Sequence, residues 1–134
     1  MTAKVTLDLA RIDQMATQAA EKGLKTALAR GEAVLRADIL SRPGSGRQYG
    51  KHRASAPGEP PAVDTGNLRN KTQADANLRA DGDDLVGRIV ANTDYAAALE
   101  LGTERMAPRP FLSRLLNEHA PELERAFVIG AKQS

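Results

Sequence analysis

Apolar residues recur at intervals of three and four over residues 7–40, the spacing of one face of an α-helix. Residues 41–44, Ser-Arg-Pro-Gly, would end such a helix. The pattern therefore predicts one long amphipathic helix. At ~1.5 Å per residue it would extend about 50 Å, longer than a domain of this size is wide, so we expect part of it to pack on a neighbour. Gly23 and Gly31 could bend it.

The middle of the chain carries the pattern of a β-hairpin. Small apolar and polar residues alternate over 72–80, the period of a strand with one buried face. The sequence Asp-Gly-Asp at 81–83 supplies a turn, and residues 85–91, LVGRIVA, return as the partner strand. A short helical turn over 66–70 precedes the hairpin, where the oxygen of Asp64 or Thr65 can cap it.

Two further helices are expected after the hairpin. The first is short, covers 95–101, is capped by Asn92, Thr93 or Asp94, and ends at Gly102. The second covers 111–131 with apolar residues on one side, and Pro121 is expected to interrupt it. Residues 106–110 between them are expected to be extended, because they include two prolines. The whole pattern predicts an α+β fold in one domain, 1–134, with the first and last helices packed on a small antiparallel sheet.

Between the first helix and the sheet lies a long extended loop over 41–63, expected to protrude. Pro57, Pro60 and Pro61 lack amide donors, so neither a helix nor a central strand can run through this region. The loop exceeds the ~12 to 15 residues beyond which an unstructured connection is usually functional or disordered. It holds four cations (Arg42, Arg47, Lys51 and Arg53) against Glu59, a net charge of +3, while the whole chain carries +2. We expect this loop to contact a partner, and to be mobile in the isolated subunit.

Composition narrows the classes of protein to which the chain can belong. The chain has no Cys, which excludes disulfides, thiolate metal sites and a cysteine nucleophile. Only two Tyr and two Phe are present, so the core is thin in aromatics and an oligomer is favoured. Neither a membrane span nor a signal peptide is expected, which places the chain in a cytoplasm. A pI of about 9.2 permits nucleic acid nearby without demanding it.

The strings that resemble catalytic or ligand motifs have simpler explanations. Asp64-Thr65-Gly66 has the local order of a dimeric aspartic protease, yet a helix cap is the favoured interpretation because no apolar strand precedes it. Glycines at 44, 46 and 50 lack the strand and Lys-Ser/Thr of a phosphate loop. His52 and His119 suggest no metal site, and the acidic residues at 81–84 lack the spacing of a calcium loop. No cofactor is predicted.

The order of three sequence blocks is more specific than any single string. The first is APGEPP at 56–61 followed by Asp64, Thr65, Gly66, Leu68 and Arg69; the second holds Tyr95, Ala96, Leu99, Glu100, Gly102 and Thr103; the third is Arg109, Pro110, Phe111 and Leu112. In this order they resemble the neck or tail-completion family of long-tailed bacteriophages, small head-to-tail joining or minor tail proteins. The resemblance covers nearly the whole chain, and all three blocks match.

The resemblance implies a structural protein of the virion, assembled in the host bacterial cytoplasm, without enzyme activity. It implies a homo-oligomer, a hexameric ring, stacked between head-completion or adaptor proteins and tail terminator or tail tube proteins. DNA would pass through the lumen without sequence recognition. We expect the contacts with subunits and partners to come from the loop and its end: Arg42, Arg47, Tyr49, Lys51, His52, Arg53, Pro57, Glu59, Pro60 and Asp64. The structural motif would be Tyr95, Glu100, Gly102, Arg109, Pro110 and Phe111.

Two other functions remain open from the sequence. The segment 42–53 could grip phosphates as a basic nucleic-acid-binding module, or Asp64 could serve a hydrolase. DNA affinity that falls steeply with salt would indicate the first, and loss of activity on Asp64→Asn would indicate the second.

Overall fold

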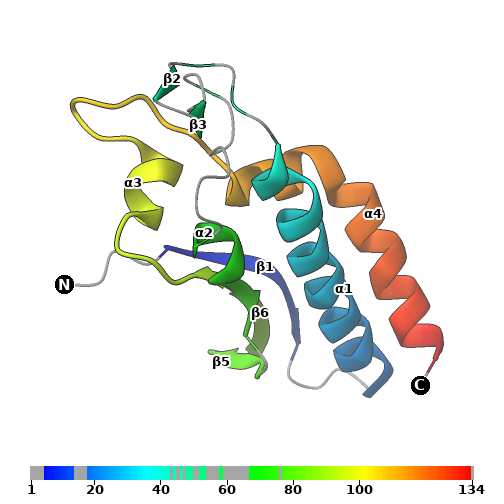
Figure 1. The fold of residues 1–134 in the computed structure, drawn as a ribbon. Coiled ribbons are helices and arrows are strands. Elements are labelled where there is room, and N and C mark those ends of the chain that lie inside the picture. Colours follow the sequence, from blue (N-terminus) through cyan, green and yellow to red (C-terminus); the bar gives the residue numbers. More distant parts are fainter. Residues whose placement is uncertain are drawn as a thin grey trace.

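The computed structural model describes residues 5–13, 18–42, 44, 46, 48–49, 52–53, 58, 67–75 and 77–133. These residues form an α+β fold, as predicted, in which two long helices pack beside one another and against a small antiparallel sheet (Figure 1). The long helices are α1 (Gln18–Ala37) and α4 (Leu112–Lys132). The short ones are η1 (Ile39–Ser41), α2 (Asn67–Asn70) and α3 (Ala96–Leu101).

The prediction of one helix over 7–40 is wrong in its first part, which forms strand β1 (Val5–Asp13). β1 pairs antiparallel with β6 (Asp84–Ala91), and its register shifts between Asp8 and Ala10. This bulge leaves both Leu9 and Ala10 packed against the core, so the apolar spacing imitates a helical interval. With α1 only 20 residues long, the helix extends about 30 Å, and its length no longer argues for a neighbour.

The sheet has the order β1-β6-β4, with β5 also paired to β6. The predicted hairpin is confirmed: β5 (Arg79–Asp81) pairs with β6, and Gly82 adopts a φ of 59° in the turn. The predicted strand over 72–80 is split, because β4 (Thr72–Ala74) and β5 pair with different ends of β6. β1 therefore forms one edge of the sheet.

Helices α1 and α4 approach closely at glycines. A Cβ added to Gly130 of α4 would lie 2.2 Å from Thr26 Oγ1, and one added to Gly23 of α1 would lie 2.7 Å from the Phe127 carbonyl oxygen. These glycines allow close helix contact. Pro121 does not interrupt α4, contrary to the prediction. The helix tolerates it because Pro121 and Asn117, whose carbonyl loses its partner, are both exposed and accessible to water.

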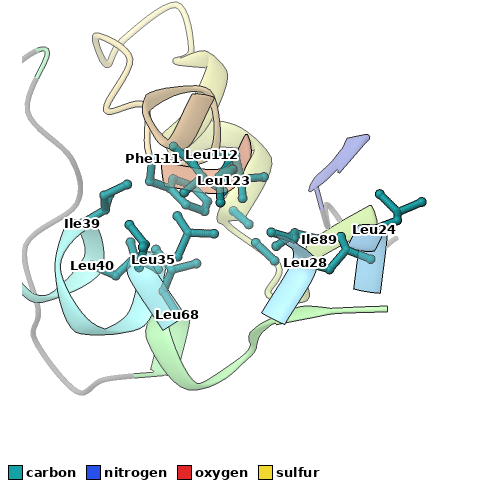
Figure 2. Close-up of a cluster of buried hydrophobic side chains, with 14 residues drawn as sticks. Leu24, Leu28, Leu35, Ile39, Leu40, Leu68, Ile89, Phe111, Leu112 and Leu123 are labelled. Atoms are coloured by element: carbon teal, nitrogen blue, oxygen red, sulfur yellow. The ribbon is translucent and has the colours of Figure 1, made fainter. Parts of the chain in front are cut away.

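The core lies between the helices and the sheet. Figure 2 shows Leu24, Leu28 and Leu35 of α1 among side chains from the other elements, with Ile89 of β6 and Phe111 in the same cluster. Phe111 is fully buried, which confirms the expectation that this scarce aromatic fills the core. The apolar side of α4 is buried only in part, because Leu116 and Val128 remain exposed.

The long loop contains a small two-stranded sheet that the prolines did not lead us to expect. β2 (Gln48–Tyr49) pairs antiparallel with β3 (His52–Arg53). Both strands lie before the first of the three prolines, Pro57, so proline does not exclude them. In Figure 1 they lie beyond the ends of α1 and α4, on the side of the molecule away from the C-terminus.

Candidate assembly site: the motif junction

Residues in and beside the three sequence blocks, far apart along the chain, are hydrogen-bonded to one another. Asn67 stands between Gly66 and Leu68 of the first block, and its Nδ2 lies 3.0 Å from the hydroxyl of Tyr95 in the second. The amide of Gly58, which is in the first block, donates to the carbonyl of Pro108 beside the third. The amide of Arg109 in the third donates to the carbonyl of Leu99 in the second, at 2.7 Å. We call this convergence the motif junction: Gly58, Asn67, Tyr95, Leu99, Glu100, Gly102 and residues 108–113.

Glu100 joins α3 to the start of α4. Its Oε1 accepts the backbone amides of Phe111 at 3.0 Å and Leu112 at 2.6 Å, and its Oε2 accepts the hydroxyl of Ser113 at 2.8 Å. The first amides of a helix have no partner within the helix, and a carboxylate there also interacts favourably with the helix dipole. The partly buried carboxylate of Glu100 therefore caps α4 from a distant element.

Gly102 shapes the turn between the second and third blocks. It has a φ of 78° and its amide donates to the carbonyl of Ala98, so it ends α3 as predicted. A Cβ at this position would lie 2.9 Å from Pro108, a second reason for glycine. At the other end of α3, the predicted cap by Asn92, Thr93 or Asp94 is wrong. The N-cap is Tyr95, without a side-chain bond, and the buried Thr93 hydroxyl has no partner among the described residues.

The long loop is held at two points by the first turns of α4. At its start, Arg42 pairs with Asp38 at 3.1 Å and with Glu118 at 2.8 Å. Further along, the Gly58 carbonyl accepts a hydrogen bond from Arg114, and Arg114 pairs in turn with Glu118 at 3.1 Å. We call the segment 43–58 between these anchors, which contains β2 and β3, the hairpin arm. One pair on α4, Arg114 and Glu118, therefore fixes both ends of the arm relative to the helices.

Charge pairing at this anchor changes the proton affinity of its members. Arg42, by hydrogen bonding and charge, lowers the pKa of Asp38 and is the main cause of the lowered pKa of Glu118. Asp38 and Glu118 raise the pKa of Arg42 in return. His119 extends the network, since its Nε2 lies 3.3 Å from Asp38 and its Nδ1 lies 3.0 Å from Glu122. His119 thus links two carboxylates within an ion-pair network and is not a lone surface residue.

The structure places the predicted contact residues unevenly. Arg42 is tied within its own chain. For Tyr49, His52 and Arg53 the structure gives the backbone, in β2 and β3. The other predicted contact residues lie outside the described residues: Arg47, Lys51, Pro57, Glu59, Pro60 and Asp64. Thr65, which with Asp64 was a possible helix cap, also lies outside them. The motif residues Tyr95, Glu100, Gly102, Arg109, Pro110 and Phe111 all lie in or beside the motif junction.

Sequence reasoning missed Arg114 and Glu118, the pair that anchors the arm. Their only signal is a spacing of four on one helix face, which many surface ion pairs share. Gly58 was recognised as part of the first block, but its contact with Pro108 has no sequence signal.

Within the described ranges, no three His, Cys, Asp or Glu side chains gather in a way that could hold a metal ion. Among the helices of the same residues, none has the length and apolarity to cross a membrane. Comparisons of the chain with known protein families, curated proteins and solved structures found no match.

Proposed function

We propose that this chain is a structural subunit of the head-to-tail connector of a long-tailed bacteriophage or phage-like particle. It forms a ring with further copies of itself, joins head to tail and lets DNA pass. The observation that carries the proposal is the motif junction. Glu100 of the second block is bonded to Phe111 of the third, and Asn67 and Gly58 connect the region of the first block to Tyr95 and Pro108. Residues that form one local structure are expected to occur together in a family.

The arrangement of the junction suits a structural role. Its polar side chains are used to join elements: the Glu100 carboxylate caps α4, and the Arg114 guanidinium holds the arm. Between the two anchors of the arm, strands β2 and β3 lie beyond the ends of α1 and α4 (Figure 1). A cationic segment that is anchored at both ends is a suitable contact for the acidic surface of another subunit or another ring.

The proposal is tested by removing the gene from the phage or prophage that carries it. We expect separate DNA-filled heads and complete tails, and joined particles once the purified protein is added back. A variant lacking residues 45–56 should fold, as judged by circular dichroism, but should not join heads to tails. Joined, infectious particles formed without the protein would contradict the proposal.

DNA-binding measurements on the same purified protein distinguish the proposed function from the competing one, nucleic-acid binding. Duplex DNA affinity should be weak and should change little when residues 45–56 are removed. Tight binding that is lost with these residues and falls steeply between ~50 and 200 mM salt would favour a phosphate-binding module instead.

A further inference from the structure

An open apolar groove of about 430 Å³ separates the edge strand β1 from helix α4. Leu9 and Ala10 of β1 form one wall, and Leu116, Phe127 and Val128 of α4 form the other. The groove therefore lies between an edge strand of the sheet and one side of α4.

Two of the exposed apolar side chains of α4 line this groove. Leu116 is 36% exposed and Val128 is 47% exposed. Ile129, 55% exposed, follows Val128 directly but lines the opposite groove between α1 and α4. Val128 and Ile129 therefore lie on two different sides of α4.

Charge indicates what could cover the groove. Its one charged lining residue is Glu124, which is exposed and takes part in none of the ion pairs among the described residues. The hairpin arm has the complementary composition: three cations, Arg47, Lys51 and Arg53, no carboxylate, and one aromatic, Tyr49. A cationic segment with one aromatic suits an apolar groove with one free carboxylate.

The arm of the same chain is poorly placed to reach the Val128 end of this groove. Its anchors contact Arg114 and Glu118 near the start of α4, and β2 and β3 lie away from the C-terminal end of that helix (Figure 1). At ~1.5 Å per residue, Val128 lies about 21 Å further along α4 than Arg114. The arm of another copy has no such restriction.

We propose that the hairpin arm of a second copy of this chain docks in the groove between β1 and α4. Tyr49 contacts the apolar walls, and the arm's cations lie near Glu124. The contact joins two different surfaces, and such a contact builds a ring when its rotation, repeated around an axis, closes on the first copy. The inference rests on the proposed ring and names the surfaces that build it.

The test compares oligomers of Val128→Asp and Tyr49→Ala with those of the matched control Ile129→Asp. Each is measured by native mass spectrometry and sedimentation, for the chain alone and with the particle's other neck proteins. We expect the first two variants to raise the dissociation constant of the oligomer at least tenfold, and the control to resemble wild type. Unchanged circular dichroism and melting temperature identify variants that still fold.

Cross-linking tests the same contact by position. Because the chain has no Cys, Tyr49→Cys can be mixed with either Val128→Cys or Ile129→Cys and treated with a short bismaleimide. Links between chains are expected with Val128→Cys and not with Ile129→Cys. A wild-type oligomer insensitive to Val128→Asp and without the link would overturn the inference and leave the proposed ring intact. Single copies under both conditions would contradict the ring and the inference together.

Discussion

Glu100 is the residue on which the motif junction most depends, because one carboxylate accepts two amides of the first turn of α4 and the hydroxyl of Ser113. We expect Glu100→Ala to lower the free energy of unfolding by about 2 kcal/mol, since it removes a cap and leaves partly buried amides unpaired. Glu104→Ala, at an exposed position nearby, should change it by less than ~0.5 kcal/mol. Urea unfolding measures both, and equal small effects would contradict the capping role.

The role of Glu100 could not be predicted from the sequence, whereas the burial of Phe111 could. The chain has two phenylalanines, and Phe111 stands at the start of an apolar helical pattern. A core position for Phe111 therefore follows from the pattern alone. A capping glutamate is normally recognised three residues after the N-cap, within the helix it serves. Glu100 lies in α3, and the chain returns to the start of α4 after the turn at Gly102.

Among the elements, the hairpin of β5 and β6 was predictable and β1 was not. The Asp-Gly-Asp turn between alternating strands is a local signal that tertiary contacts did not override. In β1 a bulge shifts the apolar alternation after Asp8, and the altered spacing resembles that of the helix that follows. The small sheet of β2 and β3 was missed because its two-residue strands are too short to show a pattern.

The close contact between α1 and α4 predicts that substitution by alanine changes stability differently at Gly130 and at Gly31. Gly130→Ala places a Cβ within 3.0 Å of both Thr26 and the Lys22 carbonyl, and we expect a loss of about 1 to 3 kcal/mol in stability. At Gly31 the nearest atoms are side-chain ends of Ile89, at 3.0 Å, and Leu115, at 3.2 Å, which can shift. There the gain of ~1 kcal/mol in helix propensity offsets much of the crowding.

Thermal unfolding of the two alanine variants measures this difference. Gly130→Ala should melt clearly below Gly31→Ala. Equal melting temperatures would show that the helices can separate at Gly130 without cost, against the close packing described here.

The anchor of the hairpin arm predicts how stability depends on pH. Asp38 and Glu118 have lowered pKa values in the folded chain, chiefly because of Arg42. A lowered folded pKa gives stability that is present above the unfolded value, near ~4, and is lost as the pH falls through the folded value. The urea midpoint should therefore fall between pH 6 and pH 3.

Arg42→Gln should reduce this difference between pH 6 and pH 3, because it removes the main cause of both shifts. The remaining difference comes from Asp75 and Glu122, whose pKa values are also lowered, mainly by the Asn77 amide and by Arg30 respectively. Arg105→Gln, at an exposed position, is the matched control. If both variants keep the wild-type difference, the ion pairs at the arm's base do not contribute to stability.

At the scale of the whole molecule, the hairpin arm and the β1–α4 groove make the chain asymmetric. Strands β2 and β3 of the arm lie beyond the start of α4, while the groove is lined by α4 residues from Leu116 to Val128. Two different surfaces on one subunit allow rings, whereas a single self-complementary surface stops at a pair. The small aromatic content and the apolar residues left exposed on α4 are consistent with a chain that buries more surface on assembly.

The measurement that tests the ring most directly is the mass of the native protein, alone and together with the particle's other neck proteins. We predict a closed hexamer of the 14.3 kDa chain, formed either in isolation or on contact with the neighbouring ring. A single copy of the chain in both samples would contradict the ring, and with it the account of this protein as a subunit of the head-to-tail connector.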